Sequence, residues 1–270
     1  MKHYIIRGGI EGKKRLEVLA RTMWPVTSRA LERAGLRSGM TSVDLGCGGG
    51  DVTRELAAAV GPNGRAVGLD FDEVKLALAR EAAAKHGLDN LEFRQMDIAN
   101  WAEESCYDFI YCRFLLTHLK DPQALLGKML RAVRPGGAVL VEDIDFAGYV
   151  HYPRCRALEK YVSLYQAAAE RRGCDADIGP KLYLMLLDTG WKELGLEVVQ
   201  PTFFSGEGKE IAILTLINIA EAVLAEELAT KAELETAIDE LTTYTADERT
   251  IISMPRVFQV WGRRALTPAA

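Results

Sequence analysis

Short apolar runs alternate with helical stretches between residues 41 and 145. The apolar runs lie at 42–45, 66–69, 91–94, 107–112 and 138–141, and helix-like segments separate most of them. Runs of this length bounded by glycine, proline and acidic residues are typical of buried strands. Strands that alternate with helices pair in parallel through right-handed crossovers. The pattern therefore predicts an α/β fold with a doubly wound, mostly parallel sheet.

Two further strands are expected outside that stretch, at 196–199 and 257–261, which makes seven in all. Residues 1–40 are predicted to form an N-terminal helical lid, interrupted at Pro25, with Thr27 and Ser28 capping a second helix. Residues 41–145 form the expected core. Residues 146–270 complete the sheet and carry inserted cap helices at about 150–190 and 209–244.

The composition excludes several classes of protein. Lys and Arg number 33 against 38 Asp and Glu, a net charge of −5, so the basic footprint of a nucleic-acid binder is absent. The five cysteines are scattered, with no C-x-x-C pair, which argues against a disulfide scaffold or a cysteine-rich metal site. No apolar run is long enough for a membrane span, and the first residues lack a signal-peptide core. We expect a soluble, cytoplasmic protein without a metal.

The first strand runs into the glycine-rich stretch Gly46-Cys47-Gly48-Gly49-Gly50 and then into a helix. Glycines allow positive φ and close approach of the backbone to a ligand, and the N-terminus of a helix favours an anionic group. Asp70 closes the second strand, where a carboxylate can accept hydrogen bonds from both hydroxyls of a ribose. Asp97 follows the third strand and can accept from an exocyclic amine of a base.

The backbone amide of Ile98 can donate to a neighbouring ring nitrogen, and the side chains of Phe71 and Ile98 offer apolar surfaces for adenine. Three successive strand ends thus present groups for an anionic tail, a ribose and a base. An adenosine-containing ligand is predicted at this edge of the sheet.

The chain resembles the class I S-adenosylmethionine-dependent methyltransferases, and within them the small-molecule enzymes of ubiquinone and menaquinone biosynthesis. The resemblance rests on the segments 44–50, 68–70, 96–98, 108–112 and 130–137. It implies a Rossmann-like fold and S-adenosyl-L-methionine as cofactor. The cofactor-binding residues that it implies are Asp44, Gly46, Cys47, Gly48, Asp70, Phe71, Asp97, Ile98, Cys112 and Arg113.

The chemistry implied is direct in-line transfer of the methyl group to a small organic acceptor, positioned by a helical cap. No covalent nucleophile is required, and a base matters only for an acceptor that is protonated at neutral pH. The candidate catalytic residues are His118, Asp143 and Asp145. Tyr149, His151 and Tyr152 are candidates for an acceptor pocket, and Tyr4, Arg7 and Arg21 for a lid.

Alternatives remain at this point. In a dinucleotide fingerprint Asp51 would occupy the third glycine position and repel a pyrophosphate, which disfavours an NAD-type oxidoreductase. Arg113 follows the fourth strand, where a cation disfavours a divalent metal. A non-catalytic S-adenosylmethionine-binding or regulatory protein is the main alternative. The acceptor, the atom that is methylated and the oligomeric state are left open, including a homodimer formed through the apolar segments 182–187 or 211–224.

Overall fold

A seven-stranded sheet organises the molecule. The computed structural model describes Ile6 and residues 12–266. The strand order is β3-β2-β1-β4-β5-β10-β7. All neighbours from β3 to β5 are parallel, and β10 runs antiparallel to both β5 and β7. The strands are β1 (Thr41–Leu45), β2 (Arg65–Asp70), β3 (Leu91–Gln95), β4 (Tyr107–Arg113), β5 (Val133–Asp145), β7 (Lys192–Val199) and β10 (Arg256–Arg263). The predicted doubly wound, mostly parallel sheet is confirmed.

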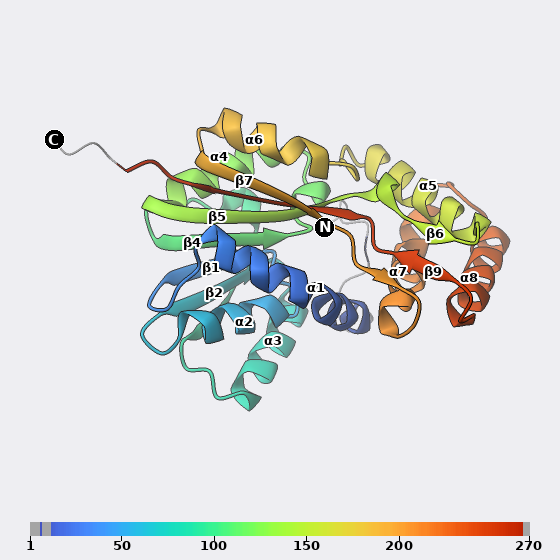
Figure 1. Ribbon diagram of the computed structural model, residues 1–270, viewed down its shortest axis with the longest axis horizontal. Coiled ribbons are helices and arrows are strands. Elements are labelled where there is room, and N and C mark those ends of the chain that lie inside the picture. The colour runs from blue at the N-terminus through green and yellow to red at the C-terminus, as the bar shows by residue number, and fades with distance from the viewer. Residues whose placement is uncertain (1–5, 7–11, 267–270) are drawn as a thin grey trace.

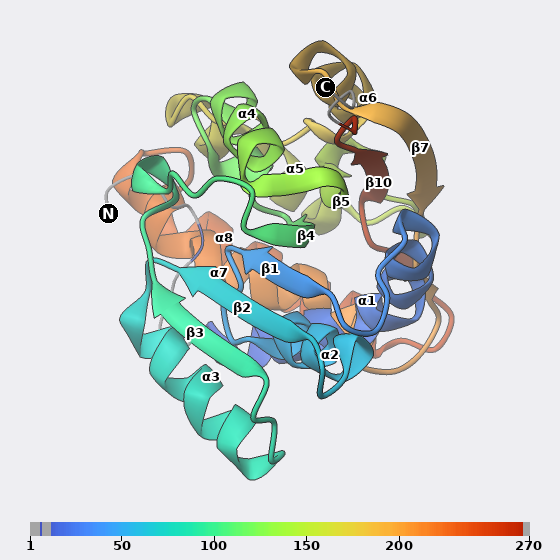
Figure 2. The same ribbon diagram turned by 90° about the vertical axis from the view of Figure 1, so that its left-hand side faces the viewer.

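Helices cover both faces of this sheet (Figures 1 and 2). One face carries α1 (Lys13–Ala34), α2 (Asp51–Val60) and α3 (Glu73–Lys85), and the other carries α4 (Pro122–Ala132) and α6 (Leu182–Thr189). The central strand β4 supplies both cores, because successive side chains point to opposite faces. Phe109 and Tyr111 pack with α1 and α2, whereas Ile110 and Cys112 pack with α4 and α6.

A helical lobe lies beyond the carboxyl end of β5 (Figure 1). It consists of α5 (Arg156–Arg171), α7 (Ile211–Ala225) and α8 (Lys231–Ala246), with a small sheet ordered β6 (His151–Tyr152), β9 (Ile251–Ser253) and β8 (Thr202–Phe203). Leu158, Leu216 and Leu241 are fully buried in its core. Most of the apolar segment 211–224 is therefore packing within the lobe.

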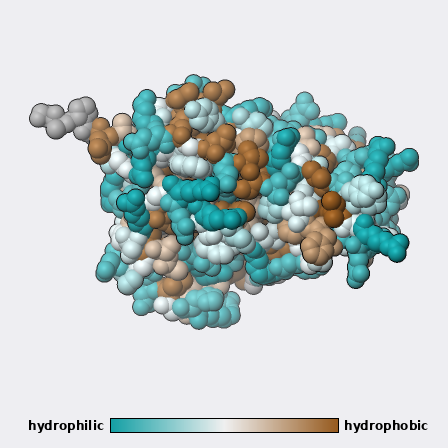
Figure 3. All heavy atoms as spheres, viewed as in Figure 1, coloured by the Kyte–Doolittle hydropathy of each residue, from teal (hydrophilic) through white to brown (hydrophobic). Residues whose placement is uncertain are grey.

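The α6 helix lies on the sheet beside α4, outside the helical lobe. It exposes 59% of Leu184 and 45% of Leu187, and the neighbouring edge strand β7 exposes Leu196 and Val198. Figure 3 shows apolar side chains over this region of the surface among hydrophilic ones. The use of this face in a homodimer stays a prediction.

Two local predictions are wrong. Pro25 does not split the N-terminal helix, because α1 continues through it to Ala34. Proline removes one backbone hydrogen bond, and the burial of Met23, Ala30 and Leu31 holds the helix together on either side. The expected cap residue Thr27 lies inside the helix instead, where its hydroxyl donates to the Glu142 carboxylate at 3.0 Å.

Residues 134–137 belong to the fifth strand. β5 begins at Val133, and its register against β4 shifts between Tyr107 and Phe109 to accommodate the extra residues. The strand also persists to Asp145, which buries Glu142 and Asp143 within the sheet. None of the described helices is long and apolar enough to cross a bilayer.

Candidate functional site

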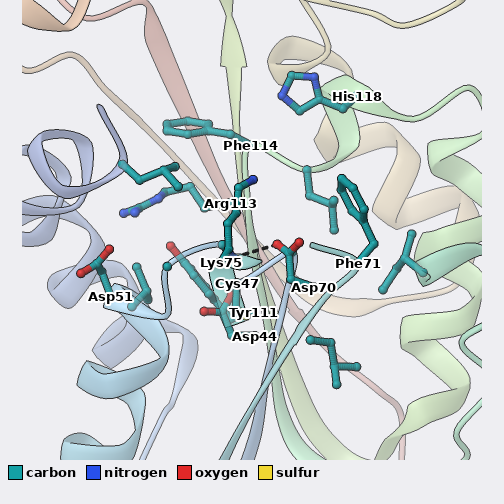
Figure 4. Close-up of a pocket in the computed structure, with 18 of the residues that line it drawn as sticks. Asp44, Cys47, Asp51, Asp70, Phe71, Lys75, Tyr111, Arg113, Phe114 and His118 are labelled. Carbon is teal, nitrogen blue, oxygen red and sulfur yellow. Dashed lines mark hydrogen bonds between the residues drawn. The ribbon is translucent and has the colours of Figure 1, made fainter. Parts of the chain in front are cut away.

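A cavity of about 360 Å³ opens at the carboxyl ends of β1, β2 and β4, with α1 along one side. Its volume falls within the range of small-molecule sites, about 300–1,000 Å³. Figure 4 shows Asp70 and Phe71 on one side of it and Asp51 and Arg113 on the other. The predicted site residues that line it are Asp44, Gly46, Cys47, Gly48, Asp70, Phe71, Asp97, Ile98, Arg113 and His118.

The glycine loop between β1 and α2 depends on backbone conformations that other residues rarely adopt. Gly46, Gly48 and Gly50 have φ values of 72°, 56° and 73°. A Cβ on Gly50 would lie 2.5 Å from a ring carbon of Phe93, so this position also lacks space. The loop is tied to β2, because the amides of Gly46 and Cys47 both donate to the carbonyl of Leu69, at 2.8 and 3.0 Å.

Asp70 stands at the end of β2 and faces the loop. One carboxylate oxygen accepts from the Gly48 amide at 2.8 Å, and the other accepts from the Asp72 amide at 2.9 Å (Figure 4). These bonds fix the orientation of the carboxylate, and each oxygen keeps a second lone pair for a ligand hydroxyl. At the next strand end, Asp97 accepts from the Ala99 amide at 2.9 Å.

Asp44 forms the floor of the cavity and is 3% exposed. Burial raises its pKa to about 7, while the hydrogen bond from the Thr53 hydroxyl at 2.7 Å and the nearby Arg113 lower it. An uncharged Asp44 near neutral pH would ionise in the presence of a cationic ligand group, because an opposite charge stabilises the carboxylate.

A buried polar network lies behind this floor and is centred on Glu142. Its carboxylate accepts from the hydroxyls of Thr27 and Tyr111 and from the Gln259 amide. Arg113 donates to the same Thr27 hydroxyl at 3.4 Å. The network thereby fixes two residues that face the cavity, Tyr111 and Arg113.

His118 and Phe114 lie at the other end of the cavity from Asp44 and Tyr111 (Figure 4). Burial, with the nearby charges of Arg15 and Lys75, lowers the pKa of His118 to about 3. The imidazole is therefore neutral at physiological pH and can accept a hydrogen bond.

The two predicted catalytic aspartates do not line the cavity. Asp143 is fully buried and accepts from the Thr117 amide at 3.1 Å, so it holds the short 3-10 turn at Leu116–His118 in place. Burial raises its pKa to about 7. Asp145 forms an ion pair with Arg256 at 2.6 Å, away from the cavity. The strand continues through both residues, as the expectation of a shared face requires, but neither carboxylate reaches the cavity.

The predicted acceptor-pocket cluster is also dispersed. The Tyr149 hydroxyl lies 3.3 Å from that of Tyr161, within an aromatic cluster of the helical lobe. His151 lies 3.9 Å from Glu159, and Tyr152 is 72% exposed. None of the three lines the cavity. The predicted cofactor residue Cys112 does not line it either, because this residue of β4 is buried against α4.

The predicted lid is only partly described. Arg21 turns away from the cavity and makes two hydrogen bonds to Glu207, at 2.8 and 2.7 Å. Tyr4 and Arg7 lie outside the described residues. The part of α1 that does line the cavity carries Arg15, Leu16, Leu19 and Ala20.

Sequence reasoning missed several lining residues, chiefly Arg15, Lys75, Tyr111 and Phe114. Arg15 could have been found, because its spacing from Leu16, Leu19 and Ala20 places these four on one helix face. No such pattern marks Lys75. Among the described residues, no group of three or more His, Cys, Asp or Glu side chains is placed to hold a metal ion.

Comparisons with known proteins agree with this architecture. A family model described as a methyltransferase domain matches residues 36–184. The ubiquinone biosynthesis O-methyltransferase of Acinetobacter baumannii is 32% identical over 116 residues, and the demethylmenaquinone methyltransferase of Lactococcus lactis is 32% identical over 114 residues. Each match covers 42% of this chain and 48% or 45% of the relative, so the chain spans about half the length of these curated relatives.

Among solved structures, phosphoethanolamine N-methyltransferase 2 of Haemonchus contortus superposes with a TM-score of 0.58 at 17% identity. The match covers 95% of this chain and 58% of that one. This likeness shows a shared fold. With the family match over more than half of the chain, it leads to one conclusion: the chain belongs to the methyltransferase domain family, in its class I, S-adenosylmethionine-dependent form.

Proposed function

We propose that the cavity binds S-adenosyl-L-methionine and that the protein transfers a methyl group from it to a small organic acceptor by direct in-line displacement. One observation carries the proposal. The glycine loop, Asp70 and Asp97, predicted from three separate strand ends, all line one cavity of small-molecule size. Family membership supports the same reaction, and the quinone-biosynthesis names of the relatives support a small acceptor.

Each end of the cavity suits one part of the cofactor. Asp70 would accept hydrogen bonds from the ribose hydroxyls, and Phe71, Asp97 and Ile98 would hold the adenine. The loop at Gly46–Gly48 would hold the methionine portion above Asp44, whose carboxylate suits an ammonium group. When bound, the cofactor supplies a methyl group already activated by its sulfonium charge.

The acceptor would then enter at the end lined by Phe114 and His118. Neutral His118 can accept a hydrogen bond from an acceptor hydroxyl or ammonium group within reach and so orient it, whereas its lowered pKa makes it a weak base. The catalytic contribution of the remaining residues is orientation and exclusion of water, which can lower a barrier by roughly 7–11 kcal/mol.

We further propose that α1, within the N-terminal lid 1–40, is held over the cavity by the helical lobe, which acts as a cap. Arg15 donates to Thr215 of α7 at 2.9 Å. Lys14 pairs with Glu210 at 3.2 Å, and Arg21 pairs with Glu207 at 2.7 Å. The lobe thus affects the site through its contacts with α1. Among the residues that line the cavity, none comes from the lobe itself.

Two measurements test this function in sequence. Isothermal titration with S-adenosylhomocysteine should show binding to the wild type, weakened in Asp70→Ala. Incubation with methyl-labelled S-adenosylmethionine and a metabolite extract should then yield a labelled small molecule. Absence of binding contradicts the proposed site. Cofactor binding without methylation of any molecule in the extract supports the alternative of a non-catalytic cofactor-binding protein.

A further inference from the structure

Charge is divided unevenly between the two ends of the cavity. Its four lining carboxylates, Asp44, Asp51, Asp70 and Asp97, all come from the glycine loop and the carboxyl ends of β1, β2 and β3. The lining residues from α1 and from 114–119 contribute no carboxylate, and the charge of Arg15 is near enough to His118 to lower the pKa of its imidazole.

Arg15 is oriented by the helical lobe. Its Nε donates to the Thr215 hydroxyl at 2.9 Å, and that hydroxyl donates in turn to the Ile211 carbonyl at 2.7 Å. Because its one hydrogen is used in that bond, the Thr215 hydroxyl acts only as an acceptor toward Arg15. The guanidinium is thereby fixed by its Nε, and its two terminal nitrogens remain as donors.

Two other basic residues of α1 form ion pairs outside the cavity. Lys14 and Arg21 form ion pairs with Glu210 and Glu207, on the outside of the molecule. Arg15 lines the cavity, and within the described part of the chain no carboxylate lies within ion-pair distance of it. A partly buried guanidinium without a carboxylate is costly unless a ligand supplies the charge.

Resting on the proposed function, we propose that Arg15 marks an anion subsite and that the methyl acceptor is an organic acid, with a carboxylate on an apolar body. A guanidinium binds a carboxylate in a planar, two-pronged arrangement. Leu19 and Phe114 also line the cavity and provide surface for the apolar body. The carboxylate would hold the acceptor in place while His118 faces its reactive group.

The cofactor carboxylate is a less suitable partner for Arg15, because Arg113 occupies the cofactor end. Arg113 lies near the carboxylates of Glu142, Asp44 and Asp51 and donates to Thr27. Arg15 lies instead near His118 and the tyrosines of the helical lobe and donates to Thr215. The two arginines thus have different surroundings at the cavity.

Titration of the protein saturated with S-adenosylhomocysteine tests the subsite with two matched pairs of probes, benzoate against benzamide and hexanoate against hexanamide. We expect at least one acid to bind tenfold or more tightly than its amide. Arg15→Met should abolish that preference, while Arg29→Met, which removes the same charge from an exposed position of the same helix, should preserve it. Acids that bind no better than amides to the wild type, or a preference that survives in Arg15→Met, overturn the subsite.

The same experiment separates the two proposals. Failure of S-adenosylhomocysteine to bind the wild type overturns the proposed function and the subsite with it. Cofactor binding without a preference for acids overturns the subsite alone. A loss of tenfold or more in cofactor affinity in Arg15→Met would assign Arg15 to the cofactor and also overturn the subsite.

Two gentler variants keep the test valid if Arg15→Met does not fold. Thr215→Val removes the acceptor that orients Arg15 and should weaken acid binding severalfold without changing cofactor affinity. Arg15→Lys keeps the charge and should retain part of the preference for acids. Wild-type acid affinity in Thr215→Val contradicts the assigned role. Full loss of cofactor binding in Arg15→Lys contradicts it too.

Discussion

The backbone amide of Gly48 donates a 2.8 Å hydrogen bond to the carboxylate of Asp70. This bond joins the glycine loop after β1 to the end of β2, so a residue expected to bind the ribose also fixes the loop expected to bind the methionine portion. The two motifs are 22 residues apart in sequence and act as one structural unit.

Asp70→Ala should weaken S-adenosylhomocysteine binding at least tenfold. The substitution removes an ionised acceptor, whose hydrogen bonds are worth about 1.5–3 kcal/mol, and it frees the Gly48 amide. Isothermal titration measures the effect. Asp188→Ala, at an exposed position on α6, provides the matched control and should bind as the wild type does. Equal affinities for the two variants would show that Asp70 is not in the binding site.

Gly50→Ala should destabilise the fold by about 2–5 kcal/mol, from the left-handed backbone and the collision with Phe93. Gly39→Ala separates these two causes. Its φ is also positive, at 84°, but an added Cβ would meet nothing within 4 Å. This control should lose only about 1–2 kcal/mol. Urea unfolding monitored by circular dichroism gives both values, and a Gly50 variant no less stable than the Gly39 variant contradicts the packing argument.

Stability should fall as the pH rises from about 5 to about 7. Burial raises the pKa of Asp143 from its ordinary 3.8 to about 7, so in this window the folded state holds a proton that the unfolded state has released. Each such group lowers the free energy of unfolding by up to about 1.4 kcal/mol per pH unit, and the slope vanishes above the folded pKa.

Asp44 shares this shift, whereas His118, with its pKa lowered to about 3, binds a proton only in the unfolded state and offsets part of the fall below about pH 6.5. Asp143→Asn should therefore reduce the slope. Urea unfolding at a series of pH values checks the difference, with Asp188→Asn as the control that keeps the full slope. A stability that rises with pH over the same window, or an unchanged slope in Asp143→Asn, would mean that Asp143 is ionised in the folded protein.

His118 should remain neutral throughout the range from about pH 5 to about pH 8, because its pKa is lowered to about 3. An exposed histidine, by contrast, titrates near pH 6.5. The ring-proton resonance of His118, assigned by its loss in His118→Gln, should therefore not move over this range in the protein without ligand. A midpoint near pH 6.5 would place the imidazole in contact with water.

The sheet and the residues that its strand ends place around the cavity were predictable from the sequence because both depend on local pattern. Strand ends such as Asp70 and Asp97 follow short apolar runs directly, and the glycine loop is contiguous. The parallel topology then brings these separate points together at one edge.

The part of the cavity lined by α1 and residues 114–119 was predicted less fully because it depends on tertiary contacts. Asp143 and Asp145 were expected to share a strand face near the acceptor. The strand β5 does continue through them, but Asp143 is buried against the 3-10 turn and Asp145 pairs with Arg256. Arg15 comes from the N-terminal helix and is oriented by Thr215, 200 residues away. No local pattern records a contact of that separation.

A crystal structure with S-adenosylhomocysteine is the most direct test of the account. We predict the ribose hydroxyls within hydrogen-bond distance of the Asp70 carboxylate, the adenine beside Phe71 and Ile98, and the sulfur facing the end lined by His118. An empty cavity in crystals that contain the ligand elsewhere, or a ribose bound away from Asp70, would contradict it.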